Sequence, residues 1–261
     1  MATPAVARAR PQPAAGLERF LERLANALVS ACALIALGIF RLVDSTLDVR
    51  IYGHEHLIAA RRNGRRLLFV VWHGKGLIPV LFFQGSPLVI YTSTLREPRH
   101  RGGLSKQVRR FTLAALRHMG YQVLDAATFA TESRGVIRFL QMLETGAGGI
   151  IAADGPLGPM YRAKPGAAFV AKRAHVGLVP VGAAMEHSIV LDSWDRFEVP
   201  RPFSAAVLTI GEMLTVPDQA TDEELAALSR RLETVLNDLT TRAELEAFAS
   251  EPPVIAAPGL S

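Results

Sequence analysis

Two polar side chains come directly after strongly apolar runs of the sequence. His73 follows Leu67 to Trp72 (LLFVVW), and Asp154 follows Gly149 to Ala153 (GIIAA). Ligands of open α/β sheets bind outside the carboxyl ends of the strands, so we expect both side chains to face one crevice. A histidine in that place can act as a general base near neutral pH, or it can serve as a structural hydrogen-bonding group.

A loop rich in glycine and proline follows Asp154 and carries two cations. Its sequence is DGPLGPMYRAKPG, and its candidate ligand-binding residues are Gly155, Pro156, Gly158, Arg162, Lys164 and Gly166. Pro165 suits the first turn of a helix that begins at Gly166. A basic loop that runs into a helix N-terminus can bind a phosphate or another anion. An ordinary strand-to-helix turn would have a similar composition, so both interpretations stay open.

A basic stretch lies between the two motifs. Its cationic side chains are Arg96, Arg99, His100, Arg101, Lys106, Arg109, Arg110 and Arg117. The stretch has few interleaved aromatic side chains and no nucleic-acid signature. We therefore expect a solvated face or a contact with lipid headgroups, and no nucleic-acid partner.

The composition excludes several classes of protein. The chain has 261 residues, 49% of them hydrophobic and 20% charged, with a net charge of +5, which is unlike a disordered chain. The only cysteine, Cys32, excludes an intramolecular disulfide and a zinc site built from cysteines. His54 and His56 are isolated from other ligands, so we expect no metal site.

The apolar excess is concentrated near the N-terminus. We expect residues 1–15, rich in Ala and Pro, to form a disordered tail, and residues 16–44 to form an apolar, membrane-associating helix. Its uncharged part, Ala25 to Phe40, spans roughly 24 Å at about 1.5 Å per residue, against about 30 Å for a hydrocarbon core. The helix could lie in the interface, enter it obliquely or span it with help from flanking residues. A buried core helix is the alternative.

The remaining chain alternates between strand and helix patterns. The continuous apolar runs typical of buried strands are Leu67–Trp72, Leu88–Thr92, Gly149–Ala153, Leu178–Val181 and Ala206–Ile210. Helical periodicity appears around residues 108–119 and 136–143, and Thr221 to Glu224 predicts a capping box for a C-terminal helix. We therefore predict one α/β domain over 45–245, with a mixed, largely parallel sheet flanked by helices, and a C-terminal tail over 246–261.

Together these motifs resemble the lysophospholipid acyltransferase superfamily, and within it the bacterial DUF374 branch. The matching residues are Trp72-His73-Gly74, Asp154-Gly155-Pro156-x-Gly158-Pro159, Lys164-Pro165-Gly166, Val179-Pro180-Val181, Ser193-Trp194-Asp195-Arg196-Phe197, Pro200-x-Pro202-Phe203-Ser204 and Gly211-Glu212. The resemblance runs in order from about residue 45 to 245 and includes the C-terminal helix.

The resemblance implies a membrane-associated O-acyltransferase with no bound cofactor. Its acyl donor would be acyl-CoA or acyl-carrier protein, and its acceptor a hydroxyl of a lysophospholipid, a glycolipid precursor or a lipid A-type saccharide. We expect it at the cytoplasmic face of the inner membrane, either monotopic or with one N-terminal anchor. The sequence gives no oligomeric state.

In the superfamily, a histidine and an acid five positions later form the catalytic pair. His73 matches the histidine, but position 78 is Ile78, so in an active enzyme we expect another residue to take that role. Asp154 is the first candidate, and Glu97 is the second. Leu157 stands where this branch often has arginine. Either Arg134, Arg162 or Lys164 supplies the missing charge, or the acceptor carries less negative charge than lysophosphatidate; Arg96 joins the substrate-binding candidates.

Two other functions remain open on the sequence. Ile78 and Leu157 would suit a degenerate relative that binds lipid without catalysis. The same fold could also hydrolyse acyl esters or thioesters, although the chain contains no Gly-x-Ser-x-Gly elbow for a serine mechanism.

Overall fold

The computed structural model describes residues 14–62, 64, 66–92, 103–125, 128–129, 131–155 and 157–249. The predicted tails therefore lie largely outside the described residues: all but two residues of 1–15, and everything after 249 in 246–261.

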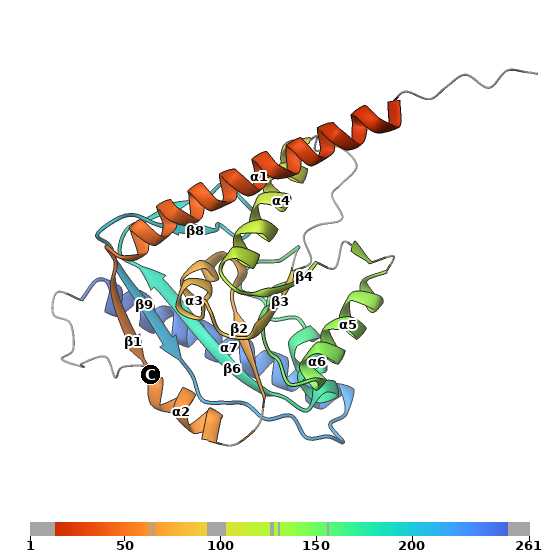
Figure 1. Cartoon of the computed structure of the whole chain (residues 1–261). Helices are drawn as coiled ribbons and strands as arrows, with labels where there is room; N and C mark the ends of the chain where they lie inside the picture. The colour runs from red at the N-terminus through yellow and green to blue at the C-terminus, as the bar shows by residue number, and fades with distance from the viewer. Residues whose placement is uncertain are drawn as a thin grey trace, which may run out of the picture.

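A seven-stranded sheet forms the centre of the molecule (Figure 1), in the order β1-β9-β6-β2-β5-β3-β4. The strands are β1 (Asp48–Tyr52), β2 (Leu67–Val71), β3 (Leu88–Thr92), β4 (Gln122–Asp125), β5 (Gly148–Ala152), β6 (Gly177–Met185) and β9 (Ala205–Ile210). Neighbouring strands run parallel except β6 and β9, which are antiparallel. The predicted α/β class with a mixed, mostly parallel sheet is confirmed.

All five apolar runs predicted as strands are strands of this sheet. Every residue of β2, β6 and β9 is buried, so these strands show continuous apolar runs in place of alternation. The sequence pattern does not reveal β1 and β4, because their sequences, DVRIY and QVLD, have no such run and lie at the two edges of the sheet.

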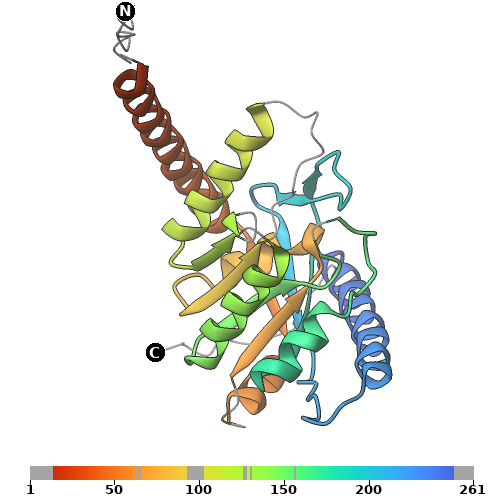
Figure 2. The same cartoon turned by 90° about the vertical axis from the view of Figure 1, so that its right-hand side faces the viewer.

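Helices cover both faces of the sheet and enclose two large hydrophobic cores, besides a small cluster around Tyr52. Alternate residues of β2 point to opposite faces. Leu68 and Val70 pack with α5 (Glu132–Glu144), α6 (Gly166–Ala174) and α7 (Asp222–Ala247). Leu67 and Phe69 pack with α2 (His54–Arg62), α3 (Leu77–Phe82) and the end of α4 (Gly103–His118). Figure 2 shows α4 on one side of the sheet and α7 on the other.

The longest helix, α1 (Ala14–Asp44), lies against α4 and extends beyond the sheet (Figures 1 and 2). Its exposed large apolar side chains are Phe20, Leu24, Leu28, Leu34, Ile35, Ile39 and Leu42. A fully buried core helix would not leave these side chains in solvent. In the described part of the chain, no helix combines the length and hydropathy needed to cross a bilayer.

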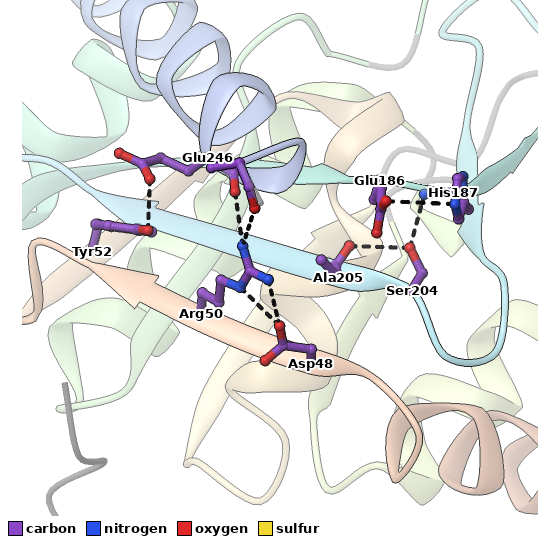
Figure 3. A network of polar contacts seen from close by, with 9 residues as sticks. Asp48, Arg50, Tyr52, Glu186, His187, Ser204, Ala205 and Glu246 are labelled. Atoms are coloured by element: carbon purple, nitrogen blue, oxygen red, sulfur yellow. Dashed lines mark hydrogen bonds and ion pairs between the residues drawn. The ribbon is translucent and has the colours of Figure 1, made fainter. Parts of the chain in front are cut away.

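The C-terminal helix α7 is capped at its N-terminus and hydrogen-bonded to β1 at its C-terminus. The predicted capping box is confirmed, since Thr221 accepts from the main-chain N–H of Glu224 and Glu224 accepts from that of Thr221. At the other end, Arg50 of β1 donates to the carbonyls of Glu246 and Ala249 at 3.1 and 3.2 Å (Figure 3). Helix α7 therefore has hydrogen-bonded ends, and it packs along β6 and β9.

Candidate active site

His73 stands at the carboxyl end of the central strand β2. It begins a 3₁₀ turn, η1 (His73–Lys75), and its side chain is 45% exposed. The main-chain N–H of His73 donates to Asp154 Oδ1 at 3.0 Å. Asp154 lies two residues after the end of the neighbouring parallel strand β5, so the structure brings together the two residues that sequence reasoning placed in one crevice.

Asp195, and not Asp154, holds the imidazole ring. Nδ1 of His73 lies 2.5 Å from Oδ2 of Asp195, which is 122 positions later in the chain and only 4% exposed. The prediction that Asp154 partners the ring is therefore wrong, because the hydrogen bond of Asp154 goes to the backbone of His73. The second candidate, Glu97, lies outside the described residues.

Asp195 sits between two short strands, β7 (Ser188–Val190) and β8 (Glu198–Pro200), which pair into a separate two-stranded sheet. The Ser193 hydroxyl donates to Asp195 Oδ1 at 2.6 Å. Burial by itself raises the pKa of Asp195, but the hydrogen bonds from His73 and Ser193 outweigh it and hold that pKa below its usual value. The carboxylate is thus ionised at neutral pH and accepts from Nδ1–H.

This arrangement sets the tautomer of His73. With the proton on Nδ1, the lone pair of the neutral ring is on Nε2. Nε2 has no hydrogen-bond partner among the described residues. The rings of Trp194 and Phe197 flank the imidazole, with centroids 5.4 and 6.2 Å from its own. His73 therefore presents a basic nitrogen beside an apolar wall.

Gly74 allows the η1 turn and the Asp195 loop to meet. A Cβ atom at this position would lie 2.0 Å from the carbonyl oxygen of Asp195, closer than any contact a side chain can make. Gly158 has a similar role, since its φ is 66° and a Cβ there would lie 2.7 Å from the Trp194 ring. These glycines bring three separate loops together around His73.

Asp154 has a buried carboxyl group, and a hydrogen bond from the described residues reaches only one of its two oxygens. The residue is fully buried, and Oδ2 has no hydrogen-bond partner among the described residues. Burial raises the pKa of Asp154, and the hydrogen bond from the His73 backbone offsets only part of that rise. Ionised Asp154 consequently costs free energy in the folded state.

The stability of the protein should therefore depend on the protonation of Asp154. Because its folded pKa lies above the unfolded value of about 3.9, its contribution is fully present below that value and is lost as pH rises through the folded pKa. Relative to Asp154→Asn, the wild type should lose unfolding free energy between pH 4 and pH 8. Urea unfolding of both proteins at the two pH values measures this, and an equal difference at both would contradict it.

Lys164 is the predicted cation that lies beside this cluster. Its Nζ and Cδ would be 3.2 and 3.1 Å from a Cβ on Gly155, which has a φ of 63°, and its main-chain N–H donates to Ala153 at 2.9 Å. No carboxylate of the described residues forms an ion pair with Nζ. Gly166 begins α6 two residues later in the sequence.

The other predicted binding residues lie elsewhere or outside the described residues. Arg162 pairs with Glu233 of α7 at 2.8 Å, which gives this cation a structural partner. Arg134 is exposed in the first turn of α5. Arg96 and Pro156 lie, like Glu97, outside the described residues. Among the described residues, no group of three or more His, Cys, Asp or Glu side chains is arranged to hold a metal ion.

Comparison with known proteins gives few matches. No protein-family model matches the chain, so the DUF374 assignment stays a prediction. A protein of Rickettsia prowazekii (strain Madrid E), described as uncharacterized protein RP090, is 25% identical over 154 residues, which is 59% of this chain. The match spans 66% of that relative's length. The crystal structure of the 1-acyl-sn-glycerophosphate (LPA) acyltransferase PlsC from Thermotoga maritima aligns with a TM-score of 0.49 at 15% identity, over 83% of this chain and 79% of that one.

Proposed function

We propose that the protein is an O-acyltransferase that moves a fatty acyl chain from a thioester to a hydroxyl of a lipid acceptor, with His73 as the general base. The observation that carries the proposal is the 2.5 Å contact between Nδ1 of His73 and the buried carboxylate of Asp195. An alcohol has a pKa far above 7, so it needs a positioned base to become a nucleophile. A neutral imidazole with an unpartnered Nε2 is such a base.

The reaction is a single displacement at the thioester carbonyl. The acceptor oxygen attacks the carbonyl carbon while its proton passes to Nε2 of His73, and the ionised Asp195 stabilises the imidazolium. When the tetrahedral intermediate collapses, the C–S bond breaks and the imidazolium returns the proton to the departing thiolate. The products are an ester and a free thiol, and the enzyme regains neutral His73.

Lys164 is the proposed site for an anionic group of the acceptor. Its ammonium is half-buried, lacks an ion-pair partner among the described residues and precedes the N-terminus of α6. A half-buried cation binds an anion more strongly than a fully solvated one, because water screens the charge less. A phosphate or sugar phosphate on a lysophospholipid or glycolipid fits this site.

The proposed location is the cytoplasmic face of the inner membrane, where acyl-CoA and acyl-carrier protein are available. The exposed apolar side chains of α1 support an interfacial contact with lipid. Phe203, which is 83% exposed, extends this apolar surface, since its main-chain N–H donates to Thr46 just beyond the end of α1. The exposed cations Arg41 and Arg201 lie near these residues in the sequence and suit anionic headgroups.

The structure also bears on the non-catalytic alternative. Its main support was Ile78, which leaves no acid at the spacing typical of the superfamily. Asp195 supplies a carboxylate to His73 from a distant part of the chain, so this argument against catalysis no longer applies.

Product analysis tests the proposed function. Detergent-solubilised protein is given labelled acyl-CoA or acyl-carrier protein, with or without a pool of lysophospholipids and glycolipids. We expect an acylated lipid that forms only when the acceptor is present. Free fatty acid without acceptor would identify a hydrolase, and no product from either donor, with vesicle binding retained, would identify a lipid-binding protein; both results would overturn the proposal.

A further inference from the structure

A second ion pair runs beside the His73–Asp195 contact. Nζ of Lys75 lies 2.7 Å from Oε1 of Glu198, at the start of β8. The η1 turn and the segment 195–198 are thus joined twice, once through His73 and once through Lys75. Between the two contacts, Gly74 meets the carbonyl of Asp195.

Lys75 is buried, and it has two acidic partners. Only 8% of its side chain is exposed, and Glu244 of α7 lies 3.0 Å from the same Nζ atom. Burial by itself lowers the pKa of Lys75, but the two glutamates raise it above its ordinary value, so the ammonium is charged. Solvent does little to screen the Lys75–Glu198 pair, whose side chains are 8% and 15% exposed, in contrast to a surface salt bridge.

The loop that carries Asp195 needs such an attachment. It joins β7 and β8, which have three residues each, and an isolated two-stranded sheet is marginally stable. The His73 side chain is itself 45% exposed, so Trp194 and Phe197 enclose only part of the ring. Helix α7, in contrast, is held along the main sheet and fixed to β1 (Figure 3).

We propose that Lys75 is a positioning residue, whose ammonium between Glu198 and Glu244 fixes the loop carrying Asp195 against the turn carrying His73. The geometry of the His73–Asp195 hydrogen bond then depends on Lys75, although the ammonium of Lys75 pairs with Glu198 and Glu244 and not with either member of that hydrogen bond. The consequence for rate rests on the proposed acyl transfer, but the consequence for the hydrogen bond does not.

Proton NMR of protein with ¹⁵N-labelled histidine tests this directly. A short hydrogen bond to a carboxylate gives the Nδ1–H of His73 a far-downfield signal, assigned by its loss in His73→Ala. In Lys75→Met we expect this signal to broaden or disappear and to exchange faster with solvent. Lys75→Arg, which keeps the charge, should restore part of the signal.

Lys172→Met is the matched control. Lys172 is half-buried and, like Lys75, joins two elements, since its Nζ donates to the carbonyl of Ala220 at 2.6 Å. Its contacts lie on α6 and the turn before α7, not on the Asp195 loop. The His73 signal should therefore remain in this variant, even where its unfolding free energy falls.

Kinetics and a second variant complete the test. We expect Lys75→Met to lower kcat on the order of 10²-fold, as a misplaced catalytic group does, with little change in KM. If Lys75→Met does not fold, Glu198→Ala is the second variant. Lys75 keeps Glu244 as its partner there, so we expect this variant to fold. Its Nδ1–H signal of His73 should also be lost. An unchanged His73 signal in a folded variant would overturn the proposal. If the wild type shows no acyl transfer but the His73 signal is lost in Lys75→Met, the positioning role is upheld and the proposed function is rejected.

Discussion

Replacing Asp195 with asparagine should lower kcat for acyl transfer about 10⁴-fold, the loss seen when the same change is made in a Ser-His-Asp triad. The Asp195 carboxylate lies 2.5 Å from Nδ1 of His73 and also accepts from Ser193. An amide at this place cannot stabilise the imidazolium, and its NH₂ group would favour the tautomer with the proton on Nε2. Steady-state kinetics with saturating donor and acceptor measure the effect.

The chain offers a matched control for this substitution. Asp218 forms the same kind of contact with Nδ1 of His175, at 2.8 Å, but both side chains are exposed and lie at the end of α6. Asp218→Asn should therefore leave kcat at the wild-type value. Equal kcat values for the two variants would contradict the role given to Asp195.

Replacing Gly74 with alanine should separate the η1 turn from the Asp195 loop. The added Cβ would lie 2.0 Å from a main-chain carbonyl, and no side-chain rotation can relieve a clash with backbone. We expect the free energy of unfolding to fall by about 1–3 kcal/mol, as for other overpacked sites. Since the His73–Asp195 pair is displaced, kcat should also fall on the order of 10²-fold.

Urea unfolding and kinetics on the same preparation measure both effects. Gly38→Ala serves as the control, because a Cβ on Gly38 meets nothing within 4 Å. A folded Gly74→Ala protein with wild-type kcat would show that the close contact between turn and loop has no part in catalysis.

The parts of the fold that follow from local pattern could be predicted from the sequence. Continuous apolar runs identify the buried strands, and the Thr221 capping box identifies the start of α7. Ligands of open α/β sheets bind outside the carboxyl ends of the strands, and this predicted that His73 and Asp154 lie together, because they follow the adjacent parallel strands β2 and β5. Edge strands such as β1 have no comparable signal, since only part of each is buried.

The partners of the site residues depend on tertiary contacts, which a local pattern does not contain. Asp195 belongs to the motif Ser193-Trp194-Asp195-Arg196-Phe197, but nothing in its spacing shows that it returns to His73 from 122 positions away. Lys75 resembles any exposed lysine in the sequence, yet the structure buries it between Glu198 and Glu244. Arg162 looked like a ligand cation until the structure placed Glu233 beside it.

The initial rate of acyl transfer by wild type, His73→Ala and His175→Ala tests the central claim most directly. Both histidines contact an aspartate through Nδ1, but only His73 stands at the carboxyl end of the central strand. The rate of His73→Ala should be about 10²–10⁴-fold lower than that of the wild type, which is the usual contribution of a general base. His175→Ala should keep the wild-type rate. A folded His73→Ala protein that transfers acyl chains at the wild-type rate would contradict the account.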